Sequence, residues 1–170
     1  YEEALECYDK AIELDPKRDN SWNCKGVYLQ GRKKHKESIK CFDKAIELDP
    51  KDALYWNNKG ISLRVLKKYE EALECYDKAI ELDPNYVGGR GAGIGGWQNK
   101  SYIYGEIFFD YEKEVECCKK VLSIDPDYPY TSNNIGWALT KLGRTDEAEK
   151  YIIKAFEDIP TDSHFLNTLR

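Results

Sequence analysis

The 170-residue sequence has no run of about 18 apolar residues, the length that a bilayer-spanning helix needs, and no charged-then-apolar leader. It has two histidines, His35 and His164, and six cysteines with no C-x-x-C pair, so a zinc site is not expected. No Ser-His-Asp or Cys-His arrangement is visible. These absences predict a soluble, cytoplasmic, non-enzymatic chain without metal or cofactor.

The charge balance is mildly acidic, with 26 basic residues against 31 acidic ones and a net charge of −5. A chain with this balance is not expected to bind nucleic acid as a whole. The densest basic run, 31-GRKKHK-36, has no interleaved aromatic residues for base stacking. It is interpreted as a solvated turn, with an anionic partner as the alternative.

An internal repeat governs the sequence. The run 1-YEEALECYDKAIELDP-16 returns as 69-YEEALECYDKAIELDP-84, and 35-HKESIKCFDKAIELDP-50 is a close relative. Prolines close successive units with spacings of 34, 34, 42 and 34 residues, at Pro16, Pro50, Pro84, Pro126 and Pro160. A fixed period of this length is typical of stacked repeats.

Each full unit is predicted to contain two helices. In the third unit, apolar residues recur at helical spacing within 53–66 and again within 69–83, and Lys67 and Lys68 join the two segments. The proline after Asp83 ends the second helix, because the residue before proline is pushed out of the helical region. Neither helix can bury its apolar stripe alone, so the units must stack.

The residues that recur at this period carry a family resemblance. In the third unit they are Trp56, Gly60, Ala72, Tyr76, Ala79 and Pro84. This combination resembles the tetratricopeptide repeat, and the W-N-N-K-G phrasing is similar to repeats of archaeal proteins. The resemblance implies an all-α, right-handed solenoid of antiparallel helix pairs. Gly60 and Ala72 are expected at the crossing of the two helices, where larger residues would hold the helices apart.

The period divides the chain into a single array. The expected boundaries are a half-unit over 1–16, repeats over 17–50, 51–84, 85–126 and 127–160, and a partial first helix over 161–170. Apolar residues in the last segment, Phe165, Leu166 and Leu169, are candidates for an uncovered edge. One hypothesis is therefore end-to-end self-association through the terminal half-units.

The fourth unit has eight extra residues. Seven precede Trp97, and the eighth lies within 104-YGEIFFDY-111. Ser101 occupies the position of Gly60, and Glu114 occupies that of Ala72. A glutamate at the crossing is expected to push the helices apart or to turn its carboxylate outward.

The extra residues before Trp97 include a glycine-rich segment, 87–96, which matches G-x-G-x-x-G at 91–96. A dinucleotide loop needs a preceding strand, but a proline-terminated helix precedes this segment. A flexible insertion that lets 1–84 and 97–170 hinge is the favoured interpretation. An anion contact with Arg90 and a nucleotide site remain as weaker alternatives.

The predicted function follows from the first helices, which line the inner face of such an array. Tetratricopeptide repeats are known for binding extended peptides, so the resemblance implies a protein-binding scaffold with a protein or peptide partner. Carboxamides along that face could pair with a peptide backbone, although they could equally tether neighbouring units. Three aromatic residues are candidate anchors or, alternatively, packing residues. The candidate peptide contacts are Asn23, Asn57, Asn58, Asn99, Tyr102, Tyr130, Asn133, Asn134 and Trp137.

Overall fold

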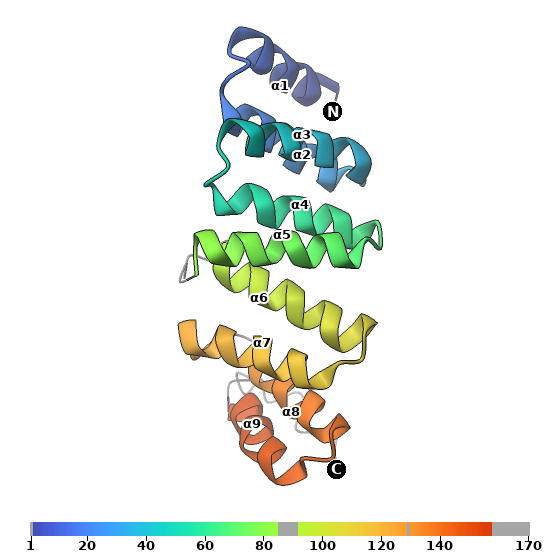
Figure 1. Cartoon of the computed structure of the whole chain (residues 1–170), viewed down its shortest axis with the longest axis vertical. Helices are drawn as coiled ribbons and strands as arrows, with labels where there is room; N and C mark the ends of the chain where they lie inside the picture. Colours follow the sequence, from blue (N-terminus) through green and yellow to red (C-terminus); the bar gives the residue numbers. More distant parts are fainter. Residues whose placement is uncertain (1, 85–91, 129, 158–170) are drawn as a thin grey trace, which may run out of the picture. The chain divides into compact units, whose positions relative to one another are not determined.

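The structure, a computed structural model, describes residues 2–84, 92–128 and 130–157. All regular secondary structure in these ranges is helical (Figure 1). The chain forms two compact units, Tyr1–Lys100 and Ser101–Arg170. The elements are α1 (Glu2–Leu14), α2 (Asp19–Gly31), α3 (His35–Leu48), α4 (Ala53–Val65), α5 (Tyr69–Leu82), α6 (Ala92–Tyr102), the π-helix η1 (Ile103–Ile107), α7 (Tyr111–Ile124), α8 (Thr131–Lys141) and α9 (Thr145–Glu157).

The first unit is a stack of helices in which each helix packs on the next, from α1 to α5 (Figure 1). Asp-Pro turns separate the repeats, as the sequence predicts. The Asp15 carboxylate accepts a hydrogen bond from the backbone N–H of Lys17 at 3.2 Å, and Asp49 repeats this contact with Lys51 at 3.0 Å. The aspartate therefore stabilises the turn that the following proline begins.

The glycine of each crossing lies against a buried aromatic ring. A Cβ placed on Gly60 would lie 2.5 Å from the Tyr76 ring, and one on Gly26 would lie 2.5 Å from the Phe42 ring. Both rings are completely buried. The predicted role of these glycines in bringing the paired helices together is confirmed.

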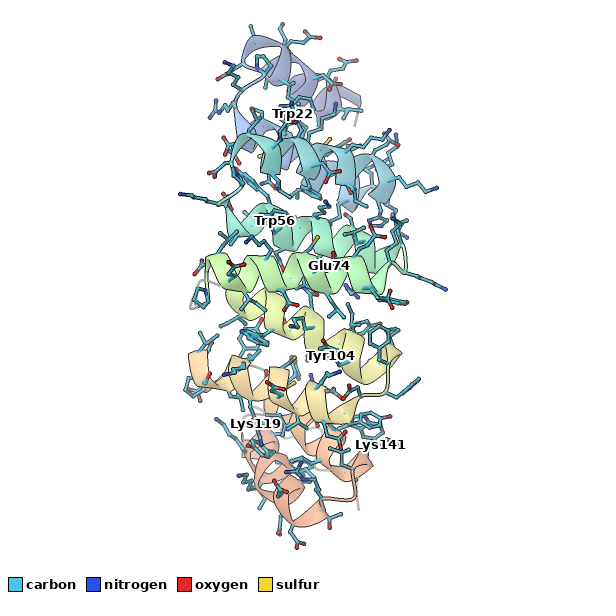
Figure 2. The ribbon with its side chains drawn as sticks, in the orientation of Figure 1. Trp22, Trp56, Glu74, Tyr104, Lys119 and Lys141 are labelled. Atoms are coloured by element: carbon cyan, nitrogen blue, oxygen red, sulfur yellow. The ribbon has the colours of Figure 1, made fainter. Side chains whose placement is uncertain are left out.

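The recurring spacing of six residues from proline to tryptophan reflects a hydrogen bond between repeats. The indole N–H of Trp22 donates to the Pro16 carbonyl at 3.1 Å, and Trp56 makes the same bond to Pro50 at 3.1 Å. Both indoles are labelled in Figure 2. Each bond links the beginning of a repeat to the proline that closes the preceding one.

The second unit contains η1 and the helices α7, α8 and α9, with α8 packed on both α7 and α9. A Cβ on Gly136 would lie 2.7 Å from Ile152, so α8 and α9 also cross at a glycine. The core of this unit is apolar and consists of Val115, Cys118, Ile135, Ala138, Leu139 and Ala148.

The eighth extra residue of the fourth repeat is accommodated by the π-helix η1. The N–H of Asp110 bonds to the Tyr104 carbonyl at 2.8 Å, whereas the equivalent bond in the third repeat joins Lys68 to Leu63 at 3.0 Å and spans one residue fewer. A π-helical turn is the usual way to insert one residue into a helix without breaking it. Phe109 then adopts a positive φ of 54°, like Lys67 at 62°.

Part of the glycine-rich segment differs from the expected insertion. Helix α6 begins at Ala92, so Gly93, Gly95 and Gly96 are helical and are not part of a phosphate-binding loop. A Cβ on Gly96 would lie 2.9 Å from Ile80, so this glycine permits α6 to approach α5 closely. Residues 85–91, with Arg90 and the proposed hinge, lie outside the described residues.

None of the described helices is long and apolar enough to cross a membrane.

Candidate functional site

Two asparagines of the first unit, Asn23 and Asn58, are buried and bonded to each other. The Nδ2 of Asn58 donates to the Oδ1 of Asn23 at 3.0 Å, which joins α4 to α2. Both side chains are buried. These two candidate peptide contacts therefore tether neighbouring repeats, which is one of the two roles that the sequence leaves open.

Asn57 lies in a similar environment. It is buried, and its Oδ1 accepts from the Nδ2 of Asn99, which is half-buried, at 3.5 Å. Gly95 lies beside the same carboxamide, because its Cβ would be 3.6 Å from the Asn57 Nδ2. Asn57 thus links α4 to α6 within the first unit and presents little surface to a ligand.

We expect Asn58→Ala to lower the free energy of unfolding by about 1–3 kcal/mol, because it leaves the buried Asn23 oxygen without its donor. Asn133→Ala is the matched control, since Asn133 is exposed on α8 and its loss should cost less than about 0.5 kcal/mol. Urea denaturation monitored by far-ultraviolet circular dichroism measures both. Equal effects of the two substitutions would contradict the tethering role of Asn58.

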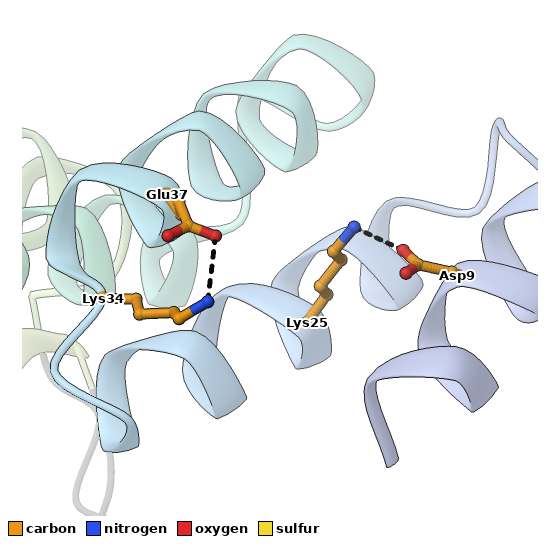
Figure 3. A network of polar contacts seen from close by, with 4 residues as sticks. All are labelled: Asp9, Lys25, Lys34 and Glu37. Carbon is orange, nitrogen blue, oxygen red and sulfur yellow. Dashed lines mark hydrogen bonds and ion pairs between the residues drawn. The ribbon is translucent and has the colours of Figure 1, made fainter. Parts of the chain in front are cut away.

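A ladder of ion pairs accompanies the asparagine tethers. Lys25 pairs with Asp9 (Figure 3), Lys59 with Asp43 at 2.7 Å, and Lys100 with Asp77. Each lysine belongs to a first helix and each aspartate to the second helix of the preceding repeat. The sequence contains a signal for these ion pairs, because Asp9, Asp43 and Asp77 recur 34 residues apart.

The lysines of the ladder are partly buried, and the environment of Lys59 raises its pKa. Burial alone would lower the pKa of Lys59, but the hydrogen bond and the charge of Asp43 outweigh burial and raise this pKa. The Lys59 ammonium also lies 5.8 Å from the centre of the Trp56 ring, and Lys100 lies 5.1 Å from Trp97. The ion pairs of the ladder therefore join neighbouring repeats, and each of the three lysines already has an aspartate partner.

The candidate contacts of the second unit are far more accessible. On α8, Trp137 is 53% exposed, Asn133 is exposed and Asn134 is half-buried. Tyr130, which precedes α8 with a φ of 62°, is 80% exposed. Residues 133, 137 and 141 share one face of the helix because they are spaced by four residues, and Tyr130 immediately precedes α8.

The face of α8 that contains Trp137 also contains a positively charged side chain, Lys141. The Lys141 ammonium lies 4.3 Å from the centre of the Trp137 ring, and Figure 2 labels Lys141 at the end of α8. A lysine held over an indole is attracted by the ring's π electrons. The face therefore offers a flat apolar surface, carboxamides and a positive charge. Tyr102, at the end of α6 in the same unit, is 45% exposed.

Glu114 forms an unusual polar centre in the second unit. Its side chain is only 6% exposed, and its Oε2 has no hydrogen-bond partner among the described residues. Burial, and then the charge of Glu106, raise the pKa of this carboxyl to about 7. Of the two outcomes that the sequence predicts for Glu114, the outward-turned carboxylate does not occur, because the side chain is buried. The carboxylate fills the space left by Gly105, whose Cβ would overlap it.

Burial makes two of the cysteine thiols less reactive. All six cysteines are free, and burial raises the pKa of Cys75 and of Cys118 to about 11, which disfavours the reactive thiolate. No group of three or more metal-binding side chains lies close together in that part of the chain.

Comparisons with known proteins agree with the repeat architecture. Tetratricopeptide repeat models match residues 20–52, 53–86 and 117–150, and also 1–18 and 94–128. No curated protein sequence matches the chain significantly.

Among solved structures, a crystal structure of MamA is 23% identical, with a TM-score of 0.80 over 91% of this chain and 86% of that chain. A structure described as MamA 41-end from Desulfovibrio magneticus RS-1 is 20% identical, with a TM-score of 0.76 over 92% of this chain and 84% of that chain. At these identities the likeness concerns the fold alone. Because the repeat models match nearly the whole sequence, the chain belongs to the tetratricopeptide repeat family.

Proposed function

We propose that this protein is an interaction scaffold whose second unit binds an extended segment of a partner protein along the exposed face of α8. This face comprises Tyr130, Asn133, Asn134, Trp137 and Lys141, and we call it the α8 face. Tetratricopeptide repeat proteins bind protein partners, which supports the coarser part of the proposal.

The exposure of the aromatic side chains supports the more specific part of the proposal, that the partner segment binds on the α8 face. Trp137 and Tyr130 are large and amphipathic, and exposed side chains of this kind are frequent anchors at protein interfaces. Asn133 and Asn134 can both donate to and accept from a peptide backbone without reading its sequence. Lys141 favours an acidic residue of the peptide close to Trp137. Tyr102 occupies the position of Trp137 in the fourth repeat and is a further candidate anchor.

The proposed site leaves out three of the contacts that the sequence suggested, because Asn23, Asn57 and Asn58 form inter-repeat hydrogen bonds. A substitution of Asn57 would therefore disturb the fold as well as any binding. Variants for a binding test are better chosen on the α8 face, where truncation removes exposed atoms.

We expect Trp137→Ala to weaken peptide binding about thirtyfold, which corresponds to the roughly 2 kcal/mol that a hot-spot residue contributes. The probes are peptides selected against the chain from a twelve-residue phage-displayed library, and affinity is measured by calorimetry. Phe156→Ala is the matched control, since Phe156 is an exposed aromatic residue on α9. Binding that is unchanged in Trp137→Ala, or equally weakened in the control, would exclude the α8 face.

Self-association is the second candidate. The terminal residues that suggested it, Phe165, Leu166 and Leu169, lie outside the described residues. Ile153 and Phe156 of α9 are exposed and favour a contact at this end of the chain. Light scattering of the chain with and without residues 161–170 tests this candidate, because a truncated chain that retains its oligomeric state would exclude it.

A further inference from the structure

The helix crossing of the fourth repeat contains an ionisable side chain. Glu114 occupies the position that Ser38, Ala72 and Ala148 occupy in the other repeats. All four side chains are buried. Serine and alanine have no charge to gain at this position, whereas a glutamate can lose its proton. Among these four crossings, that of the fourth repeat is therefore the one that can respond to pH.

The space that holds the Glu114 carboxyl is shaped by Gly105 of η1. A Cβ added to Gly105 would lie 2.3 Å from the Glu114 Oε2, so a side chain there would displace the carboxyl. The same oxygen has no hydrogen-bond partner among the described residues. A protonated carboxyl is uncharged and tolerates such a place, but an ionised one loses its hydration without compensation. Ionisation therefore favours a movement that admits water.

The charged groups closest to Glu114 in the sequence do not compensate its ionisation. On η1, Glu106 is exposed, and its negative charge adds to the effect of burial in raising the pKa of the Glu114 carboxyl. On α7, Lys113 is paired with Asp110 at 2.9 Å. Burial raises the pKa of the Cys118 thiol to about 11, so this thiol is neutral over the physiological range.

The other neighbours of α7 are uncharged or turned to other groups. The ring of Tyr104 on η1 lies 5.1 Å from the Lys113 ammonium. The one charged residue of α8, Lys141, lies over the Trp137 ring. Within the described part of the second unit, the charge that acts on the Glu114 carboxyl is thus that of Glu106. The residues that α8 contributes to the core shared with α7 are apolar, namely Ile135, Ala138 and Leu139.

The element that can give way at this crossing is η1, which has only five residues. Its wide turn is closed by two backbone hydrogen bonds, from the Phe108 N–H to the Ile103 carbonyl at 3.0 Å and from the Asp110 N–H to the Tyr104 carbonyl at 2.8 Å. Phe109, between the two donors, has a φ of 54°, which bulky residues rarely adopt. A single turn of this kind has little stability of its own, so its contact with α7 holds it in place.

We propose that the crossing of η1 and α7 is a pH-sensitive switch, which is closed while Glu114 is protonated and opens locally when the carboxyl ionises. In the open state η1 unwinds, the proton has passed to solvent, and water solvates the carboxylate. This opening is a fluctuation of the folded chain and is distinct from its unfolding.

The direction of the pH dependence follows from the protonation of the two states. The closed state binds the Glu114 proton more tightly, with a pKa of about 7 against the ordinary value of 4.5 in the open state. The closed state is therefore fully favoured below pH 4.5, and this advantage is lost as the pH rises towards 7.

The test is amide hydrogen exchange of the full chain, followed by nuclear magnetic resonance at pH 5, 6, 7 and 8. The reporters are the Phe108 and Asp110 amides, whose hydrogen bonds close η1. Their protection factors, which are corrected for the intrinsic effect of pH on exchange, should fall by more than about tenfold between pH 5 and pH 8.

Two variants separate Glu114 from other causes. In Glu114→Gln the carboxyl is replaced by an uncharged group, and the same protection factors should change by less than about threefold over this range. The matched control, Glu116→Gln, removes the same charge from an exposed position of α7 and should retain the full pH dependence of the native chain. The amides of α3, in the first unit, report on unfolding beyond the crossing.

Four results would overturn the proposal. The η1 amides could be unprotected even at pH 5, which would mean that no closed state exists. Their protection in the native chain could be independent of pH. Their loss of protection could be as large in Glu114→Gln as in the native chain. Finally, at pH 8 the η1 amides could show the same protection and the same sensitivity to low urea as the amides of α3, which would assign the effect to unfolding of the whole chain.

Discussion

The Glu114→Gln variant is expected to be more stable than the native chain at pH 8, with a free energy of unfolding higher by about 3 kcal/mol. The magnitude follows from the rise of the Glu114 pKa from 4.5 to about 7, because each pKa unit corresponds to about 1.4 kcal/mol. Glutamine resembles the protonated carboxyl in shape and carries no charge. The substitution therefore removes the free-energy cost of ionising a buried group.

The effect must depend on pH in a defined direction. Since the folded state holds the Glu114 proton more tightly than the unfolded state, the stability due to this group is fully present below pH 4.5. It is lost as the pH rises towards the folded pKa of about 7. The difference between Glu114→Gln and the native chain should grow from about 1 kcal/mol at pH 5 to about 3 kcal/mol at pH 8.

Urea denaturation at pH 5, 6, 7 and 8 measures this difference. The matched control is Glu116→Gln, which removes the same charge from an exposed position of α7 and should shift stability by less than about 0.5 kcal/mol. A difference for Glu114→Gln that is constant across the pH range would show that the Glu114 carboxyl is not perturbed. A loss of stability at pH 8 would show that its charge is stabilising.

The repeat architecture was predictable because it depends on features with a fixed register. Prolines follow the second helices, glycines stand at the crossings of the second, third and fifth repeats, and both recur with the period of the helix pairs. The structure places Gly26 and Gly60 against Phe42 and Tyr76, as that register requires. The helix pairs and their all-α stacking follow from these local rules.

The candidate site was less predictable, because position on a helix face does not determine how deeply a side chain is buried. Asn58 and Asn133 occupy inner-face positions of their helices, but Asn58 reaches Asn23 of the preceding repeat while Asn133 is exposed. That difference depends on how closely the next helix approaches. The buried position of Glu114 likewise depends on Gly105 and on a π-helical turn, neither of which has a periodic signal.

A second large change in stability is expected at Gly60, the glycine at the crossing of α4 and α5. Gly60→Ser is expected to lower the free energy of unfolding by about 3 kcal/mol, because its side chain overlaps the fully buried Tyr76 ring and overpacking of a core typically costs about 1–3 kcal/mol. Gly31→Ser is the matched control. A Cβ at Gly31 meets nothing within 4 Å, so this substitution should change stability by less than about 0.5 kcal/mol. Urea denaturation compares the two.

The chain itself contains the compensating pair. In the fourth repeat Ser101 occupies the position of Gly60, and its partner across the crossing is Cys118 where the third repeat has Tyr76. The Ser101 side chain is hydrogen-bonded to Cys118, so a smaller partner makes room for the larger crossing residue.

Tyr76→Cys should therefore cost about 1–2 kcal/mol less in the Gly60→Ser background than in the native chain, within the range of coupling between residues in contact. A double-mutant cycle by urea denaturation measures this coupling. Additive costs would mean that the two residues do not share the space at the crossing. A favourable coupling would establish that the helix pairs tolerate either a glycine with a large partner or a larger residue with a small one.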